Sequence, residues 1–268
     1  MKTTFRIITL LFAVLLTASL VSCTKINDNT KLPPELNNQI DEGQLGVEQG
    51  NVDNKGEFES VPVYWKIYDT TLYVSGNGDM TDLVEENVVP WAEYNERYDT
   101  IIVEQGVTSI CDNAFKGSSF VEIAELPDTV LSIGNFAFSH CSFLKEIDIP
   151  DYVTRLGEGA YANCVNAREI DIPDTLKRIE KNTFANCFSV EEAELENVEY
   201  VGENAFAACY ALTKVEFGAN LTEIADGAFQ MCDNLKTIEF DGTKAQWEKV
   251  KIGENNDAIK NANVKFDK

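Results

Sequence analysis

The sequence predicts an α/β solenoid, a fold in which one short unit is repeated and stacked. The segment EIDIPDYVTRLGEGAYANC, which begins at Glu146, returns 23 residues later as EIDIPDTLKRIEKNTFANC, which begins at Glu169. A small residue followed by an aromatic one also recurs every 22 or 23 residues. A unit of this length cannot bury its own apolar face, whereas stacked units can. The aromatic positions are Phe115, Phe138, Tyr161, Phe184, Phe206 and Phe229.

Each unit also contains a short run in which apolar and polar residues alternate. A period of two is typical of a β-strand that buries one face, so we expect one short parallel strand per repeat. Pro127, Pro150 and Pro173 would end their strands, because proline has no N–H to donate to a neighbouring strand. The expected inward-facing pairs are Ile101/Val103, Ala124/Leu126, Ile147/Ile149, Ile170/Ile172, Ala193/Leu195, Val215/Phe217 and Ile238/Phe240.

The repeat resembles that of a known family. Its pattern, LxxIxIPxxVxxIGxxAFxxC, is similar to the 23-residue leucine-rich repeats of BspA-type bacterial surface proteins and extends from about Tyr98 to Phe240. Both flanks are similar to the family as well: Val63–Met80 to its N-terminal β-hairpin cap and Gly242–Phe266 to its C-terminal cap. Such ends are needed because an open solenoid exposes core and sheet edge. The resemblance implies a leucine-rich-repeat solenoid that adheres to host matrix proteins or to other cells.

The first 22 residues have the features of an export signal. Lys2 and Arg6 precede an apolar run that ends near Leu20 and is too short to span a bilayer. Cys23 then follows a small-residue segment that resembles the bacterial lipoprotein processing box. The resemblance implies that Cys23 becomes the lipidated first residue of the mature protein. The alternative is an ordinary secreted protein.

The sequence therefore predicts five segments in order. Residues 23–60 are polar, with Pro, Gly, Asn and acidic residues, and have no sustained apolar period, so we expect a disordered tether. Thr24 does not resemble the Asp that retains many such lipoproteins at the inner membrane, which favours an outer-membrane lipoprotein. The resemblance to BspA-type surface proteins implies exposure at the cell surface. The segments are the signal peptide (1–22), the lipidated Cys with its tether (23–60), the N-terminal cap (61–97), the solenoid (98–241) and the C-terminal cap (242–268).

The composition is strongly acidic. The formal net charge is −23, and the acidic residues are spread along the whole chain. This charge argues against nucleic acid as a ligand and against binding of anionic membranes by charge. We therefore expect contact with the membrane through the lipid anchor only. A protein partner with a basic surface, or a host matrix protein, is compatible with the charge.

Carboxylates recur at the outward-facing position between the two residues of each inward pair. Neighbouring rungs are about 4.8 Å apart, and like charges at that spacing repel by about 1 kcal/mol per neighbour at the dielectric constant of water. Two interpretations stay open: a solvated face of an acidic protein, or a docking strip for a basic protein surface. Calcium is less favoured, because a flat row supplies few convergent oxygen ligands. The candidate binding residues are Glu125, Asp148, Asp171, Glu194, Glu216 and Glu239, and Glu146, Glu169 and Glu192 lie just before three of the inward pairs.

Five cysteines share one repeat position, three residues after the aromatic. Stacked side chains at such a position keep their Cβ atoms about 5 Å apart, whereas a disulfide needs about 3.8 Å. The same parallel spacing suits no tetrahedral metal site. We therefore expect a buried row of free thiols and no metal. These residues are Cys141, Cys164, Cys187, Cys209 and Cys232, and Ser118 stands at this position in the first repeat.

We expect neither a cofactor nor enzyme activity. His140, the single histidine, precedes Cys141, but Cys141 belongs to the buried row, so a catalytic dyad is not expected. The acidic residues are copied from unit to unit, so no pair is singled out for glycoside hydrolysis. The sequence also contains neither a phosphate-binding loop nor a GxSxG motif.

Together these observations predict a non-enzymatic envelope lipoprotein whose solenoid binds a protein, as an adhesin does. Two alternatives stay open. A glycan-binding accessory lipoprotein would need exposed aromatic residues on one face, and the candidate tyrosines do not share one repeat position. A passive structural protein of the envelope would use the solenoid only as a spacer. Those tyrosines are Tyr94, Tyr98, Tyr152, Tyr200 and Tyr210.

Overall fold

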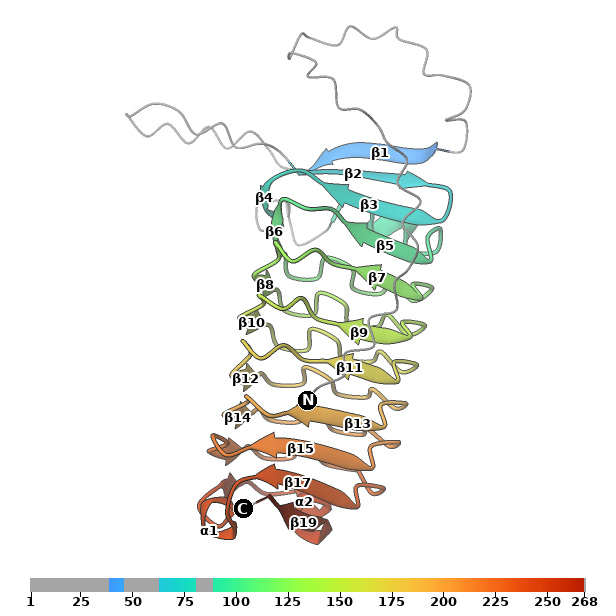
Figure 1. Ribbon diagram of the computed structural model, residues 1–268. Helices are drawn as coiled ribbons and strands as arrows, with labels where there is room; N and C mark the ends of the chain where they lie inside the picture. Colours follow the sequence, from blue (N-terminus) through green and yellow to red (C-terminus); the bar gives the residue numbers. More distant parts are fainter. Residues whose placement is uncertain (1–38, 46–62, 81–88, 268) are drawn as a thin grey trace, which may run out of the picture. The chain divides into compact units, whose positions relative to one another are not determined.

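The computed structural model describes residues 39–45, 63–80 and 89–267, and these form a parallel-strand β-solenoid (Figure 1). Each coil of the solenoid has a longer strand on one side, which we call the long-strand wall, and in most coils a two-residue strand on a second side, the short-strand wall. The long-strand wall comprises β5 (Thr100–Val103), β7 (Ile123–Glu125), β9 (Glu146–Asp148), β11 (Glu169–Asp171), β13 (Glu192–Leu195), β15 (Lys214–Gly218), β17 (Thr237–Asp241) and β19 (Asn263–Phe266).

In both walls, each strand pairs in parallel with the equivalent strand of a neighbouring coil. Its eight strands form two four-stranded sheets, β10-β8-β6-β4 and β12-β14-β16-β18. They are β4 (Gly78–Asp79), β6 (Val107–Ile110), β8 (Ser132–Ile133), β10 (Arg155–Leu156), β12 (Arg178–Ile179), β14 (Tyr200–Val201), β16 (Glu223–Ile224) and β18 (Lys251–Ile252).

Each residue of a long strand pairs with the residue at the same repeat position in the neighbouring coil. On the long-strand wall Ile147 pairs with Ile170, and Asp148 with Asp171. This register places equivalent residues in rows along the solenoid axis, and the predicted inward residues Ile101, Ile147 and Val215 are buried. The predicted strand of each repeat is therefore confirmed.

An aromatic ladder fills the interior. The predicted aromatic positions from Phe115 to Phe229 are almost fully buried, and the centroids of successive rings are 5.0–6.0 Å apart. Trp91 extends the ladder, because its ring stacks on Phe115 at 5.6 Å. Contacts of this kind add about 0.5–1.5 kcal/mol per pair to the burial of apolar surface, so the ladder couples each coil to the next.

The third side of each coil consists of turns, which corrects the α/β description of the fold. The described helices are η4 (Ala92–Tyr94), α1 (Lys244–Trp247) and α2 (Asp257–Asn261), and all lie outside the central repeats. The residues two before and two after each ladder aromatic are left-handed, and such paired left-handed residues interrupt a right-handed helix. They are Asn113, Phe136, Gly159, Asn182, Asn204 and Gly227 before the aromatic, and Gly117, His140, Asn163, Asn186, Ala208 and Met231 after it.

The N-terminal segment joins the long-strand wall. The strands β2 (Val63–Tyr68) and β3 (Thr71–Ser75) form an antiparallel pair, and β3 pairs in parallel with β5. The segment Gln39–Leu45, within the predicted disordered tether, forms β1 and pairs with β2, because the outer edge of β2 offers free backbone groups. The tether prediction is therefore wrong for these residues.

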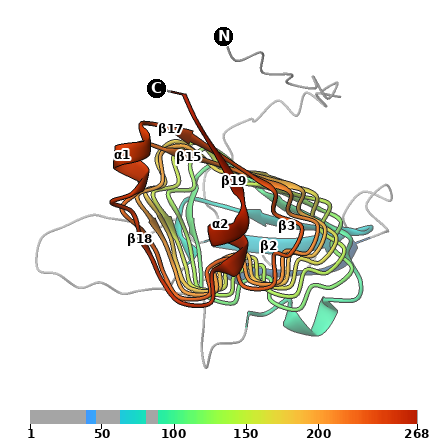
Figure 2. The same ribbon diagram turned by 90° about the horizontal axis from the view of Figure 1, so that it is seen from below.

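The C-terminal segment packs against the last coils. A capping box between Thr243 and Gln246 starts α1, and the Trp247 ring lies 5.3 Å from Phe240. Viewed along the axis, α2 lies within the outline of the stacked coils (Figure 2). The buried Asn256 carboxamide accepts from Phe229 N (3.0 Å) and donates to the Ala225 carbonyl (2.8 Å). Both flanks are thus folded onto the repeats, and their action as caps stays a prediction.

The predicted export signal and Cys23 lie outside the described residues. Among the residues that are described, no helix is long and apolar enough to cross a bilayer.

Candidate binding surface

The predicted acidic ladder lies on the outward side of the long-strand wall, one carboxylate on each of six successive coils. The register pairs Asp148 with Asp171, and Glu216 with both Glu194 and Glu239. A second row one pleat away contains Glu146, Glu169 and Glu192 and continues with Lys214. The sequence pattern thus located both rows, although it could not locate their counter-ions.

Two lysines neutralise the C-terminal part of the ladder. Lys214 Nζ lies 2.8 Å from a Glu192 oxygen and 2.7 Å from a Glu216 oxygen, and these hydrogen bonds raise the pKa of Lys214 above its usual value. Lys265 Nζ lies 2.9 Å from a Glu239 oxygen and holds the pKa of that carboxyl below its usual value. The positions of both lysines are set by the register of β15 and β19.

The middle of the ladder has no such counter-ion. We call the six carboxylates there the acidic centre, and within the described part of the chain none of them forms an ion pair with a lysine or arginine. Partial burial, followed by the charges of Asp171, Asp151, Glu146 and Asp128, raises the pKa of the Asp148 carboxyl. The acidic centre is therefore a patch of uncompensated charge, which a cation would stabilise. It comprises Glu125, Glu146, Asp148, Glu169, Asp171 and Glu194.

The same rows change character towards the N-terminus. The register places Ile102 beside Glu125 and Tyr73 beside Ile102. Ile123, the neighbour of Thr100 in the other row, is 47% exposed. The outer face therefore passes from apolar residues on β3 and β5, through Ile123 and Glu125 on β7, to carboxylates on β9 and β11.

An exposed aromatic edge flanks this face, although the sequence pattern does not indicate it. The edge consists of Phe120, Phe143, Phe188 and Tyr210, which lie in the turns before β7, β9, β13 and β15. Val165 lies at the equivalent place in the coil between Phe143 and Phe188. Phe120 and Phe143 stack at 6.1 Å, and Phe188 and Tyr210 lie 5.1 Å apart. These four side chains are 48%, 50%, 39% and 41% exposed. The signal was hidden because Phe120 and Phe143 lie five residues after the ladder aromatic, whereas Phe188 and Tyr210 lie four after it.

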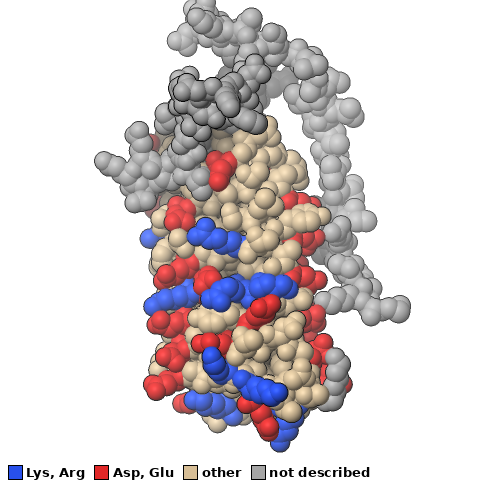
Figure 3. All heavy atoms as spheres, turned by 90° about the vertical axis from the view of Figure 1, so that its left-hand side faces the viewer, with Lys and Arg blue, Asp and Glu red and all other residues tan. Residues whose placement is uncertain are grey.

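The short-strand wall also carries basic residues. Arg178 lies over the Tyr200 ring at 4.0 Å and pairs with Glu180, and Lys181 pairs with Glu203 at 3.0 Å. Figure 3 shows acidic and basic groups interspersed on this side of the molecule. An open groove of about 300 Å³ on the same wall is lined by polar groups. Its lining includes Tyr200, Glu203, Glu223, Asp226 and Lys251.

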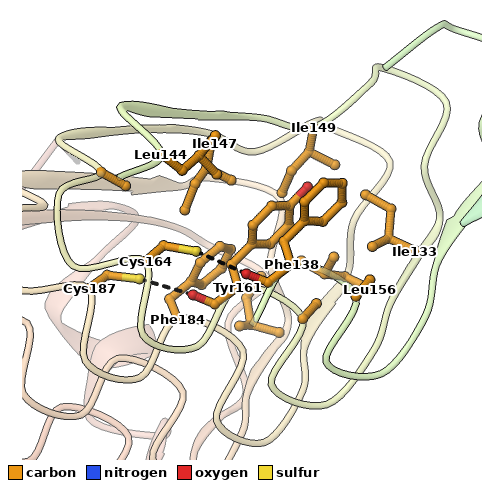
Figure 4. Packing of buried hydrophobic residues seen from close by; sticks show 14 of the residues in the cluster. Ile133, Phe138, Leu144, Ile147, Ile149, Leu156, Tyr161, Cys164, Phe184 and Cys187 are labelled. Atoms are coloured by element: carbon orange, nitrogen blue, oxygen red, sulfur yellow. Dashed lines mark hydrogen bonds between the residues drawn. The ribbon is translucent and has the colours of Figure 1, made fainter. Parts of the chain in front are cut away.

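The predicted row of buried free thiols is confirmed. Its five cysteines are free and fully buried, and each thiol donates a hydrogen bond to the carbonyl of the ladder aromatic one coil earlier, at 3.1–3.4 Å. Figure 4 shows two of these bonds, from Cys164 to Phe138 and from Cys187 to Tyr161. Burial raises the pKa of the Cys187 thiol to about 12. The thiols therefore act as hydrogen-bond donors as well as apolar groups.

The structure does not bring His140 and Cys141 together as a dyad. The Cys141 thiol is buried and bonded to the Phe115 carbonyl, and burial raises its pKa well above the usual range. His140 is exposed in the left-handed turn, with Nε2 3.4 Å from the Asn163 amide nitrogen. Within the described residues, no group of three or more His, Cys, Asp or Glu side chains has an arrangement that could hold a metal ion.

These features define a class of protein: a repeat solenoid with parallel strands, 22- or 23-residue coils and an internal aromatic ladder. A family model described as a BspA type leucine rich repeat region, in six copies, matches residues 93–197 and 132–250, which is more than half of the chain. The chain therefore belongs to the BspA-type leucine-rich-repeat family, as its repeat pattern predicts.

A search of the curated proteins found no match. Several solved structures are similar. A leucine-rich repeat protein from Bacteroides ovatus matches over 75% of this chain and 67% of its own, at 20% identity and a TM-score of 0.45. The pneumococcal vaccine antigen PcpA matches over 78% and 69%, at 15% identity and a TM-score of 0.47. A leucine rich cell surface protein from Faecalibacterium prausnitzii matches over 58% of this chain and 63% of its own, less than two thirds of its length, at 20% identity and a TM-score of 0.43. At these identities the similarity concerns the fold alone.

Proposed function

We propose that this protein is a non-enzymatic binding protein of the bacterial cell envelope, and that its long-strand wall binds the basic surface of a protein partner. The observation that carries the proposal is the acidic centre. Six carboxylates lie on four successive coils without a lysine or arginine counter-ion among the described residues, whereas the same rows are neutralised further on by Lys214 and Lys265.

The energetics support a cationic partner. Neighbouring carboxylates at the spacing of the coils repel by about 1 kcal/mol in water and by more near a protein surface. Partner lysines or arginines placed over the acidic centre would replace this repulsion by attraction and would also accelerate association. A regular wall of parallel strands offers one repeated contact over several coils, which suits an extended protein surface.

The location of the protein is part of the proposal. Cys23 would be lipidated and would hold the solenoid at the outer membrane, with most of residues 24–60 as the tether and the solenoid at the cell surface. The sequence features of residues 1–23 support this arrangement, as does membership of the BspA-type leucine-rich-repeat family. The partner would then be a host matrix protein or a protein of another cell, as for an adhesin.

Protease treatment of intact cells tests the location. Peptides from residues 57–268 should be released while periplasmic control proteins stay intact. If those peptides are protected in intact cells and are released only after permeabilisation, the protein lies in the periplasm and host adhesion is excluded.

A panel of immobilised host matrix proteins tests the binding face. A variant with Asp148→Asn, Asp171→Asn and Glu194→Gln should bind its partner at least about tenfold more weakly. Glu239→Gln is the matched control, because Glu239 already has Lys265 as its counter-ion. Unchanged binding of the triple variant would exclude the acidic centre as the binding face.

Glycan binding is a second candidate, favoured by the exposed aromatic edge. Aromatic side chains on one face are what a glycan-binding accessory lipoprotein requires, and Phe120, Phe143, Phe188 and Tyr210 provide them. Binding to a glycan array that is lost on substitution of Phe143 and Phe188 by serine would support this candidate.

A further inference from the structure

We propose that the aromatic edge and the acidic centre form one docking surface, and that the segment which binds there is a basic amphipathic helix lying along the solenoid axis. This inference rests on the proposed function, because it specifies the partner of the same wall. The aromatic edge supplies the apolar half of the surface and the acidic centre supplies the charged half.

The aromatic edge is a concentration of exposed apolar surface. Nine large hydrophobic side chains are exposed in the described part of the chain, and Phe120, Phe143, Phe188 and Tyr210 on this edge, together with Ile123 at the start of β7, account for five of them. Soluble proteins seldom leave contiguous apolar patches exposed unless the patch binds something. The clustering of these side chains favours an apolar occupant for the edge.

The two halves of the surface lie within one helix diameter of each other. Phe143 precedes Glu146 of the acidic centre by three residues, which corresponds to about 10 Å of extended chain. A helix with its side chains is about 10–12 Å across, so one helix can contact both halves. Lys145, which pairs with Glu122, and Arg168 lie between the halves and would direct basic partner side chains towards the acidic centre.

The spacing of the coils matches the pitch of a helix. Backbone bonds such as Phe143 N to Ser119 O (3.2 Å) and Ala211 N to Phe188 O (3.0 Å) keep the edge in register. Successive coils are about 4.8 Å apart, and an α-helix rises 5.4 Å per turn, so each turn of a bound helix would meet one coil. From Phe120 to Tyr210 there are four coil steps, about 20 Å, which a helix of about 13 residues spans.

The arrangement of the rings favours a peptide over a sugar. Phe120 and Phe143 are stacked with an angle of 12° between their planes, so each turns one face to the other ring. A pyranose ring packs on a free aromatic face, whereas apolar side chains also pack against ring edges. Anionic membrane is disfavoured as the occupant, because the carboxylates beside the edge would be repelled.

The test uses the purified full-length mature protein and two labelled synthetic peptides of about 18 residues. One is a leucine–lysine sequence whose leucines and lysines form separate helical stripes, and the other has the same composition in an order without stripes. We expect the striped peptide to bind at least about tenfold more tightly. The double variant Phe143→Ser/Phe188→Ser should remove this preference, while Tyr152→Ser, at a 59% exposed tyrosine outside the edge, should preserve it.

The outcomes separate this inference from the proposed function. Equal affinity for the two peptides, or a preference that survives the double variant, would overturn the inference. Loss of glycan-array binding in the same double variant, without any peptide preference in the native protein, would also overturn it and would assign the edge to a sugar. The variant Asp148→Asn/Asp171→Asn should weaken both peptides alike; if it weakens neither, the acidic centre is not the binding face and the proposed function itself fails. Circular dichroism of each variant verifies its folding.

Discussion

At the scale of the residue, the thiol row shows how one side chain can serve both packing and hydrogen bonding. Each thiol fills a small apolar space and donates to a carbonyl of the preceding coil. Ser118 stands at the same position in the first coil, where its hydroxyl lies 2.8 Å from the Tyr98 hydroxyl and donates to Asn95. The position therefore selects a small side chain that carries a donor.

The thiols should make stability depend on pH in the alkaline range. Burial raises the pKa of Cys187 from 9.0 to about 12, so this thiol stays protonated in the folded protein while it ionises in the unfolded chain. Its contribution to the free energy of unfolding is complete below about pH 9 and is lost as the pH rises towards 12. Urea titrations from about pH 8 to 11 measure how the free energy of unfolding falls with pH. In Cys164→Ala/Cys187→Ala this fall should be less steep than in the native protein, by about 1.4 kcal/mol per pH unit for each thiol removed. Equal slopes for variant and native protein would contradict this.

The left-handed turn position after each aromatic offers a stabilising substitution. Met231 has a φ of 61° and is 53% exposed, whereas the equivalent residues Asn163 and Asn186 are of the type that tolerates this conformation. Met231→Asn should raise the free energy of unfolding by about 0.5–1 kcal/mol, because it relieves part of the left-handed strain. Chemical denaturation measures the change. Met231→Ala is the control and should give no gain, since alanine is strained there as well.

At the scale of the element, the C-terminal segment is attached to the repeats by the pairing of β18 and β19 with β16 and β17, and also by one buried amide. The Asn256 carboxamide accepts from Phe229 N, and its two N–H groups are shared among three carbonyl oxygens within 3.3 Å of its nitrogen, those of Ala225, Gly253 and Glu254. Asn256→Ala should lower the free energy of unfolding by about 2–4 kcal/mol, because it leaves buried backbone groups without partners. Thermal unfolding measures this, with the exposed Asn261→Ala as control. A loss no larger than in the control would show that this segment does not cap the core.

The sequence was sufficient for the strands and insufficient for the turns. The alternation of residues such as Ile147 and Asp148 predicts one strand per repeat, because a half-buried strand has a period of two. The left-handed geometry of the turns was not predicted. In a unit of 22 or 23 residues, a short helix and a pair of left-handed turns would place apolar residues at a similar spacing, so the pattern does not distinguish them. The strand β1 could not be predicted, since Gln39–Leu45 has no strand pattern and is ordered by the free edge of β2.

The candidate site was also predicted only in part, because only some of its residues recur with the repeat. Its carboxylates repeat with the strands, so their rows were visible in the sequence. Lys214 and Lys265 were not assigned to the ladder, because their pairing depends on which residues the register brings together. The aromatic edge was missed because its members occupy two different repeat positions and only the folded coils align them.

At the scale of the whole molecule, the balance of charge along the wall should be measurable without any partner. Asp148 has a raised pKa, so its ionised form is disfavoured in the folded protein and its ionisation at neutral pH costs stability. Glu239 has a lowered pKa because of Lys265, so its ionisation contributes stability. At low salt Asp148→Asn should raise the melting temperature, whereas Glu239→Gln should lower it. At about 1 M salt, where charges are screened, the Glu239→Gln difference should shrink, whereas the Asp148→Asn difference should lose only the part due to neighbouring carboxylates and keep the part due to burial. Shifts of the same sign at low salt would contradict the assignment.

The bonding of coils only to their neighbours has a mechanical consequence. If the first coil is held at a membrane and a ligand is bound over β9 to β13, the coils between them carry the load in series, and those beyond β13 carry none. The inter-strand hydrogen bonds point along the axis, so a pull along that axis peels strands apart one rung at a time instead of shearing a whole sheet at once. Each coil that opens would release a slack of about 70–80 Å for its 22 or 23 residues. The repeat would thus act as an extensible spring that yields under flow.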